Sequence, residues 1–388
     1  MAINVNEDAE LGRRGASIAP AADRRTIRPV RKIWRAAVDA VTPYEAGKSL
    51  ETLVAELGLT ELVRLSANEN MLGASPRAIE AVRREAASIH LYPDGGSGAL
   101  RDALARGLGI SPAQIVVGNG ADELITLIAL AAFEPGDEIV MPHPSFEPYA
   151  TGANIAGARI VQSPLAGYET DLDDIRRRAT PRTKAIFLCS PHNPATTIIR
   201  REPLVAFLDA LGADPPLVVL DEAYHDFVDD PDYPDGVSLL AHYPRLVVLR
   251  TFSKIAGLAG LRVGYAIASL EAIDRFNRVR APYNVNRLGQ VAALAALEDP
   301  DHAARTRKFV LEERAYLAAG FEHRGIAFAP SQANFLLVRV ADARHARERL
   351  LAGGILVRDG AAVGFPGHLR ITVGTREINE RLLKLLEE

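Results

Sequence analysis

The chain has 388 residues, of which 48% are hydrophobic and 24% charged, a balance typical of a globular protein with a large apolar core. Its formal net charge of −4 excludes a general attraction for nucleic acid or for an anionic membrane. The single cysteine, Cys189, excludes an intramolecular disulfide and favours a small buried side chain in a reducing compartment, so we expect a cytoplasmic protein.

The N-terminal segment is polar and charged, with arginine pairs at 13–14 and 24–25. No apolar core follows these arginines, which argues against a secretory signal. No run of the ~18 apolar residues that a membrane span needs occurs anywhere in the chain. We therefore expect residues 1–40 to form an N-terminal arm, either partly disordered or covering a partner subunit.

From about residue 76, helical periodicity alternates with short apolar runs. The expected strands cover 114–118, 137–142, 158–164, 184–191, 217–223 and 245–253. Helices are expected at 76–89, 120–133 and 201–211, among others. Strands that are apolar on both faces and alternate with helices predict an α/β fold with a mostly parallel sheet covered by helices. This large domain is expected to span residues 67–290.

The pattern changes after about residue 290. A long amphipathic helix over 301–325 precedes alternating strands and helices, which are expected at 334–340, 341–354, 355–358, 369–374 and 376–388. This order predicts a smaller α+β domain made of residues 41–66 and 291–388, with a further helix around 28–41. No flexible linker separates the two domains, so we expect them to pack together and share a cleft.

Ligands of parallel α/β sheets bind beyond the carboxyl ends of the strands, where two polar turns are expected here. The first is NGADE, residues 119–123, which places free backbone N–H groups at a helix start and so predicts an anion site. The second holds Asn193 before a proline, where its side chain can donate a hydrogen bond. Taken alone, each turn is equally typical of ordinary capping or chain reversal.

Two ionisable residues follow the next strands. Asp221 ends an apolar run, where a carboxylate needs a cationic partner unless it only caps a helix, and Tyr224 follows it. Lys254 follows the last run, where burial favours the neutral amine, a nucleophile able to form a Schiff base. Ser253 and Arg262 can add to the anion site. An amine, an acid, hydrogen bonds for a ring oxygen and a phosphate site together match pyridoxal 5′-phosphate (PLP).

Many motifs in one order resemble fold-type I PLP enzymes, and more closely the histidinol-phosphate aminotransferase family. They run from about residue 43 to the end and include TPYEAGKS, LSANEN, LYPDG, VGNGADE, PHPSF, SPHNP, LDEAYHDF, TFSKIAGLAGLRVGY, PYNVN, SQANFLLVR, GILVRDG and LRITVGTREIN. The resemblance implies a large domain with a mostly parallel seven-stranded sheet, a smaller α+β domain and a homodimer.

The resemblance also implies roles at the PLP site. Lys254 would bind PLP covalently and shuttle a proton, and Asp221 would pair with its pyridinium nitrogen. Tyr224 and Asn193 would hydrogen-bond to its 3′-oxygen. The other implied contacts are Ala121, Asp122, Ser253 and Arg262 with the phosphate, Phe146 with the ring, and Tyr92 with the phosphate of the other subunit.

At the substrate end, the resemblance implies that Arg370 binds the α-carboxylate of an amino acid, for which a guanidinium fork is suited. Arg358 and Tyr44 match positions that contact the phosphate of histidinol phosphate, with Asn193 close by. We therefore expect amino transfer between histidinol phosphate and 2-oxoglutarate, with glutamate as the other amino compound, in histidine biosynthesis.

Two departures from the family pattern leave other substrates open. Residues 192–196 read HNPAT where N-N-P-T-G is common, so His192 is either a turn residue or a modifier of substrate preference, and residue 146 is Phe where Tyr is also common. An aromatic or other amino acid, or decarboxylation of a threonine-phosphate-type substrate, remains an alternative. A PLP-binding transcription regulator is disfavoured, because the first family motif already begins at Thr42. No HExxH-type spacing occurs, so no metal is expected.

Overall fold

The computed structural model describes residues 33–41, 43 and 49–387. The described residues from Ala36 onward form one compact unit, and every element named below belongs to it. The helix expected around 28–41 lies partly outside the described residues, and the described part contains a short 3-10 helix, Ala36–Ala40. The boundaries of the arm and of the two domains stay predictions.

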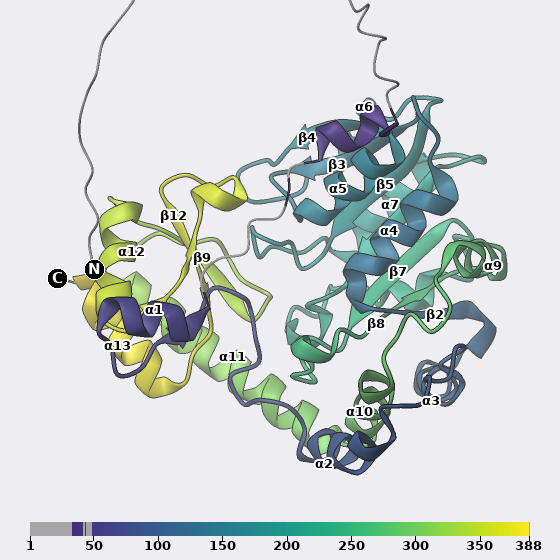
Figure 1. Ribbon diagram of the computed structural model, residues 1–388. Coiled ribbons are helices and arrows are strands. Elements are labelled where there is room, and N and C mark those ends of the chain that lie inside the picture. Colours follow the sequence, from purple (N-terminus) through teal and green to yellow (C-terminus); the bar gives the residue numbers. More distant parts are fainter. Residues whose placement is uncertain (1–32, 42, 44–48, 388) are drawn as a thin grey trace, which may run out of the picture. The chain divides into compact units, whose positions relative to one another are not determined.

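A seven-stranded sheet forms the centre of this unit (Figure 1). Its strands are β2 (Ile115–Gly118), β3 (Glu138–His143), β4 (Arg159–Pro164), β5 (Thr183–Cys189), β6 (Leu217–Asp221), β7 (Leu246–Thr251) and β8 (Gly264–Ile267). They lie in the order β2-β8-β7-β6-β5-β3-β4, and β8 runs in the opposite direction to the other six strands. The mostly parallel sheet expected from the sequence is thereby confirmed, and β8 is the strand that the apolar runs did not reveal.

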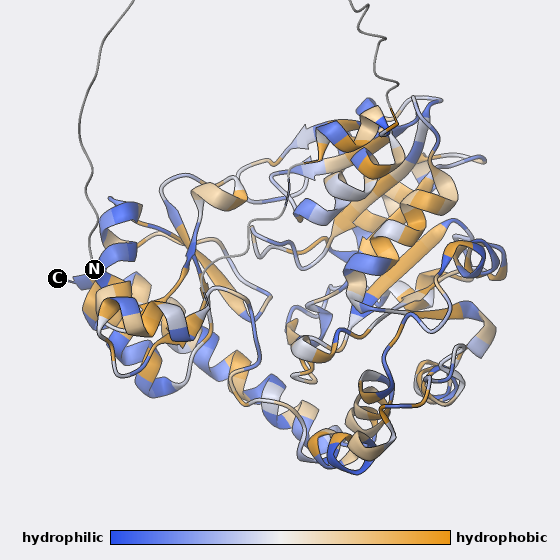
Figure 2. Ribbon diagram, in the orientation of Figure 1, coloured by the Kyte–Doolittle hydropathy of each residue, from blue (hydrophilic) through white to orange (hydrophobic). Residues whose placement is uncertain are grey.

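Both faces of this sheet are buried, as the alternation along β6 shows. Val218 and Leu220 belong to one apolar cluster, and Val219 belongs to another on the opposite face. The central strands are accordingly mostly hydrophobic beneath the helices (Figure 2). One face is covered by α4 (Gly120–Ala132), α5 (Glu147–Ala156) and α9 (Leu270–Val279). The other is covered by α2 (Pro76–Glu85), α3 (Gly98–Leu108), α6 (Leu172–Arg178), α7 (Arg201–Ala210), α8 (Gly236–Leu239) and α10 (Arg287–Leu297).

The C-terminal part of the chain forms a smaller α+β layer beside this sheet. Strands β9 (Phe335–Arg339), β11 (Arg358–Asp359) and β12 (His368–Thr372) make an antiparallel sheet with β12 in the middle. Strand β1 (Val63–Arg64) pairs with β10 (Ile355–Leu356), so an N-terminal segment joins this layer. Its helices are α1 (Leu50–Leu57), α11 (Pro300–His323), α12 (Ala343–Ala352) and α13 (Arg376–Glu387).

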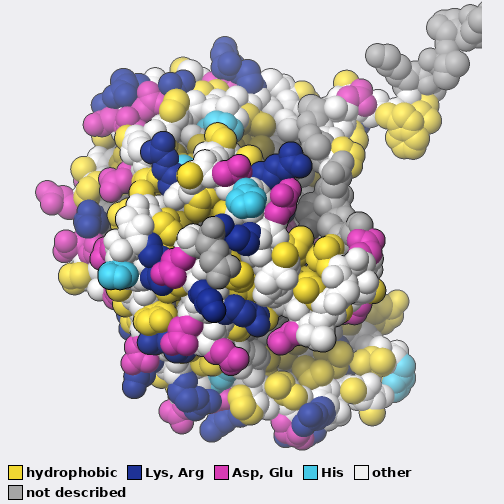
Figure 3. Space-filling model, turned by 90° about the vertical axis from the view of Figure 1, so that its left-hand side faces the viewer, with side chains coloured by type: hydrophobic (Ala, Val, Ile, Leu, Met, Phe, Trp, Pro, Cys, Tyr) yellow, Lys and Arg dark blue, Asp and Glu magenta, His cyan; other side chains and the backbone are white. Residues whose placement is uncertain are grey.

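The surface of the described part carries both signs of charge. On the face shown in Figure 3, Lys and Arg side chains are interspersed with Asp and Glu. Over the described residues, none of the helices combines the length and the apolar character that crossing a bilayer would require.

Candidate active site

Three neighbouring parallel strands bring the predicted polar side chains to one edge of the large sheet. Asp221 is the last residue of β6, Asn193 follows β5, and Lys254 follows β7. Cys189 of β5 and Leu249 of β7 both pair with Asp221 in register, so the strand ends lie level. Residues distant in sequence are thus gathered at the carboxyl edge, as expected for a parallel sheet.

Asp221 is a buried carboxyl group with only 2% of its surface exposed. Its Oδ2 accepts a hydrogen bond from the Tyr149 hydroxyl at 2.6 Å, and its Oδ1 accepts one from the Ala223 backbone N–H at 3.0 Å. Burial raises the pKa of Asp221 to about 6, because the charged form loses its hydration. Asp221 has no cationic partner among the described residues, so it is available to one supplied by a ligand.

The amine of Lys254 lies under the backbone that follows β1. Its Nζ donates to the carbonyl oxygens of Ala67 at 3.3 Å and Asn68 at 3.1 Å, and lies 5.6 Å from the centroid of the Tyr224 ring. Burial, and secondly the positive charge of Arg370, lower the pKa of Lys254 to about 8. The neutral, nucleophilic amine is therefore much more populated near physiological pH than in a solvated lysine.

A hydrogen-bonded chain joins Arg370 to Tyr224. Arg370 Nη1 donates to Asn193 Oδ1 at 2.7 Å, and Asn193 Nδ2 donates to the Tyr224 hydroxyl at 3.4 Å. The second guanidinium nitrogen of Arg370 donates to the Ser66 carbonyl at 2.7 Å. The smaller sheet and the large sheet therefore contribute side chains to the same site.

The residues of the predicted anion site lie at the N-terminus of α4. Arg262 Nη2 contacts Asp122 Oδ2 at 2.9 Å, and a Cβ on Gly120 would come within 2.6 Å of that nitrogen. A Cβ on Gly264 would come within 2.8 Å of the Ala121 backbone nitrogen. Gly120 thus leaves room for the Arg262 guanidinium and Gly264 for the first turn of α4, whose free N–H groups are suited to a phosphate. The side chain of Ser253 is buried after β7, beyond Thr251, whose Oγ1 accepts its backbone N–H.

Two arginines of the smaller sheet lie side by side. Arg358 of β11 pairs directly with Arg370 of β12 in the antiparallel register, which puts both side chains on one face of the sheet. Neither has an acidic partner among the described residues, and Arg370 is only 9% exposed with its Nε unbonded. Burial, opposed by Tyr224, lowers the pKa of Arg370. Like charges placed together are destabilising unless an anion binds between them.

Other predicted residues lie at the margin of this group or outside the described residues. Phe146 is half-buried and meets Tyr149 edge to face, with ring centroids 5.5 Å apart. Tyr92 is 78% exposed and stacks on Tyr283 at 4.7 Å, so it does not join the site of its own chain. Tyr44 lies outside the described residues.

His192 is fully buried beside Asn193. Its Nδ1 accepts the Ala195 backbone N–H at 3.1 Å, and its Nε2 has no partner among the described residues. Burial lowers the pKa of His192 to about 4, so the ring is neutral at physiological pH.

The motif assignments overlooked two residues that contact the site directly. Tyr149 follows Phe146 by three positions, so the start of α5 aims both rings at the strand ends. Asn68, within the LSANEN motif, contacts both Tyr224 and Lys254. Helical spacing could have indicated Tyr149, whereas no signal near residue 68 names the partners of Asn68.

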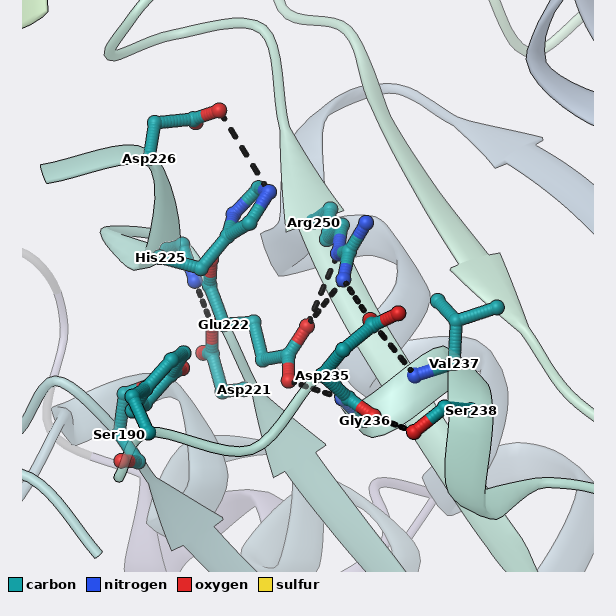
Figure 4. Close-up of polar contacts among 12 residues, drawn as sticks. Ser190, Asp221, Glu222, His225, Asp226, Asp235, Gly236, Val237, Ser238 and Arg250 are labelled. Carbon is teal, nitrogen blue, oxygen red and sulfur yellow. Dashed lines mark hydrogen bonds and ion pairs between the residues drawn. The ribbon is translucent and has the colours of Figure 1, made fainter. Parts of the chain in front are cut away.

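A buried ion pair lies directly behind Asp221. Glu222 Oε2 accepts from Arg250 Nε at 2.9 Å, and Glu222 Oε1 accepts from the Gly236 backbone N–H at 2.9 Å. Arg250 Nη2 also contacts Asp235 Oδ1 at 2.9 Å. Figure 4 shows Glu222 pointing between Arg250 and Gly236. The pair clamps the end of β6 to β7, the two strands that lead to Asp221 and Lys254.

Comparisons with known proteins agree with this geometry. Residues 60–386 match the family model described as aminotransferase class I and II. The chain is 44% identical to a histidinol-phosphate aminotransferase of Anaeromyxobacter sp. (strain Fw109-5), over 90% of this chain and 96% of the relative. It is 42% identical to one of Moorella thermoacetica, over 91% and 92% of the two chains.

Solved structures share the fold over nearly the whole chain. The histidinol-phosphate aminotransferase from Sinorhizobium meliloti in complex with pyridoxal-5′-phosphate matches with a TM-score of 0.82 and 29% identity, over 92% of this chain and 98% of that one. An aspartate aminotransferase from Thermus thermophilus matches with a TM-score of 0.76 and 26% identity, over 91% and 99%.

Proposed function

We propose that this chain, which belongs to the aminotransferase class I and II family, transfers an amino group between histidinol phosphate and 2-oxoglutarate with PLP as its cofactor. The adjacent Arg358 and Arg370 carry the assignment, because two cations without acidic partners among the described residues suit a substrate that ends in a phosphate or a carboxylate. The curated relatives named as histidinol-phosphate aminotransferases support the same substrate.

The donor set fits PLP. The glycine-lined approach of Arg262 to the start of α4 would hold the phosphate, with Ala121, Asp122 and Ser253 around it. Asp221, a buried carboxyl without a cationic partner among the described residues, would bind the protonated ring nitrogen. Phe146 would lie against the ring.

Each reacting residue has a task that its surroundings support. When bound, PLP supplies an electron sink for the carbon from which the substrate proton leaves. Lys254 would attach PLP covalently and, when released, accept or return that proton through its neutral amine, which its lowered pKa favours. Asn193 and Tyr224 would hydrogen-bond to the 3′-oxygen, and Tyr149 would hold Asp221 in place.

The arginine pair would serve both half-reactions. Histidinol phosphate presents a phosphate where glutamate presents a carboxylate, and the planar guanidinium of Arg370 can bind either group bidentately. Arg358 would add a second positive charge for the doubly charged phosphate, and Tyr44 would contact it as well. Asn193, which accepts from Arg370, would orient this arginine.

The substrate is tested by comparing kcat/KM for histidinol phosphate with that for phenylalanine. We expect histidinol phosphate to be preferred by at least about tenfold, the factor that ~1.4 kcal/mol of extra binding supplies. Arg358→Ala should reduce this preference while leaving phenylalanine turnover in place. A preference for phenylalanine would contradict the substrate, and release of CO₂ without need for a keto acid would contradict the reaction.

We also propose that the functional unit is a homodimer. The ring of Tyr92, largely exposed and stacked on Tyr283, is available to complete the phosphate site of a second copy of the chain. The cytoplasmic location remains a prediction from the sequence.

A further inference from the structure

Asn68 is a buried polar residue at the centre of the site. Only 2% of its surface is exposed, and its backbone is in the left-handed region, with φ of 54°. Asparagine tolerates this conformation better than most residues, so the chain can turn sharply between β1 and α2. This turn directs the carbonyl of Asn68 toward Lys254 and its side-chain amide toward Tyr224.

Four further residues are joined through Asn68. Its carbonyl oxygen accepts from Lys254 Nζ and from Asn334 Nδ2, both at 3.1 Å. Its backbone N–H donates to Thr372 Oγ1 at 3.0 Å, and that hydroxyl donates to Asn68 Oδ1 at 3.3 Å. Its Nδ2 donates to the Tyr224 hydroxyl oxygen at 3.1 Å. A single residue thus ties Lys254 and Tyr224 to strand β12, which carries Arg370.

These contacts determine whether the Tyr224 hydroxyl donates or accepts hydrogen bonds. Its oxygen receives N–H groups from Asn68 at 3.1 Å and Asn193 at 3.4 Å. The orientation of the Asn193 amide is fixed because Arg370 can only donate and therefore faces Asn193 Oδ1. With both lone pairs of the phenol oxygen occupied, the hydroxyl hydrogen of Tyr224 remains free to donate to another acceptor.

We propose that Asn68 is a positioning residue that makes Tyr224 a hydrogen-bond donor toward the cofactor while it holds the amine of Lys254 beside the reacting group. The inference rests on the proposed PLP site. The acceptor for Tyr224 would be the ring oxygen of PLP, whose negative charge the donated hydrogen would stabilise. The charged and titratable groups around the Tyr224 hydroxyl are Arg370 from β12, Asp221 from β6 and Cys189 from β5, with Lys254 over its ring.

The test is the pH midpoint of the visible absorbance change of protein-bound PLP. In Asn68→Gly the backbone conformation is kept and only the amide side chain is lost. The hydrogen bond from Tyr224 favours the deprotonated form of protein-bound PLP. Without the Asn68 amide this hydrogen bond weakens, so the pH midpoint should rise by about one unit. Thr372→Val, which frees the amide of Asn68 from its anchor, should raise the midpoint by less.

Two comparisons separate positioning from a structural role. In a Tyr224→Phe background, Asn68→Gly should add no further shift, because the two residues act as one unit. Asn70→Ala, which removes hydrogen bonds to Ile255 and Leu72 from the same segment, should leave the midpoint unchanged.

Three results would overturn the inference. They are an unchanged midpoint in Asn68→Gly, a shift in Asn70→Ala as large as that in Asn68→Gly, and the same shift from Asn68→Gly whether or not Tyr224 is replaced by Phe. Each of these outcomes leaves the PLP site itself standing. Failure of the unsubstituted protein to bind PLP would instead overturn the proposed function.

Discussion

At the carboxyl edge of the large sheet, burial shifts two ionisable side chains in opposite senses. Lys254 is pushed toward its neutral amine and Asp221 toward its neutral acid, because each charged form loses hydration. PLP relieves the second cost, since its ring nitrogen can supply the missing positive charge. The site therefore has a lysine that gives up its proton more readily than a solvated lysine and a carboxyl group whose charged form a cationic partner would stabilise.

The reactivity of Lys254 should follow its lowered pKa. In the PLP-free protein, the rate of its reaction with trinitrobenzenesulfonate should rise with a midpoint near pH 8, whereas a solvated lysine has a pKa near ~10.4. Peptide mapping of the labelled protein isolates this residue, and Lys254→Ala provides the blank. Labelling of Lys254 with a midpoint above pH 10 would contradict the buried environment.

Asp221 makes the stability of the PLP-free protein depend on pH. Its folded pKa of about 6 lies above the model value of 3.8, so its acid form is favoured by folding. The contribution is complete below pH 3.8 and is lost as pH rises through 6, at a cost of about 3 kcal/mol.

Asp221→Asn cannot ionise and still accepts from Tyr149. Urea unfolding at pH 4 and pH 7 should therefore show the unsubstituted protein losing about 2 kcal/mol relative to this variant, since part of the effect is already lost at pH 4. Parallel behaviour of the two proteins would show that Asp221 is already paired with a charge.

At the scale of elements, the Glu222–Arg250 pair connects β6 to β7 behind the site. Both partners are buried, so Glu222→Gln leaves the Arg250 guanidinium with the exposed Asp235 as its remaining acidic partner and should lower the free energy of unfolding by about 3 kcal/mol. Since the same pair holds the strand ends level, PLP affinity should fall as well.

The exposed pair Arg278–Asp274 offers a matched control within one helix. Arg278→Ala should leave both the unfolding midpoint and the affinity for PLP unchanged. If Glu222→Gln behaved like this surface variant, the pair would have no role in holding the strand ends.

The sequence predicts the elements better than the contacts between them. Six strands of the large sheet follow from apolar runs, because a strand buried on both faces must be hydrophobic throughout. Strand β8 was missed because it has only four residues and starts at Gly264, whose missing Cβ admits the Ala121 backbone.

For the site, too, the sequence predicts single residues better than the contacts between them. Motifs select Lys254 and Asp221, whereas Asn68 contacts residues 156, 186 and 304 positions away, which no local pattern encodes. Whether a lysine at a strand end is neutral also depends on packing from distant segments, so its pKa follows only from the fold.

At the scale of the whole molecule, the proposed dimer makes each site depend on two chains. Tyr92→Ala and Lys254→Ala subunits should each be nearly inactive alone. When the two variants are mixed, partly unfolded and refolded together, activity should recover. A hybrid dimer contains one complete site, with Lys254 from one chain and Tyr92 from the other. No recovery from dimers shown by native mass spectrometry to be mixed would remove Tyr92 from the partner's site.

Amino transfer from histidinol phosphate is the central claim, and the most direct measurement is the stoichiometry of one reaction. The purified protein with PLP is incubated with histidinol phosphate and 2-oxoglutarate, and glutamate is quantified against the substrate consumed. We expect one glutamate per histidinol phosphate consumed, and none with Lys254→Ala, while the exposed-lysine control Lys184→Ala behaves like the unsubstituted protein. Absence of glutamate from the PLP-loaded protein would contradict the account.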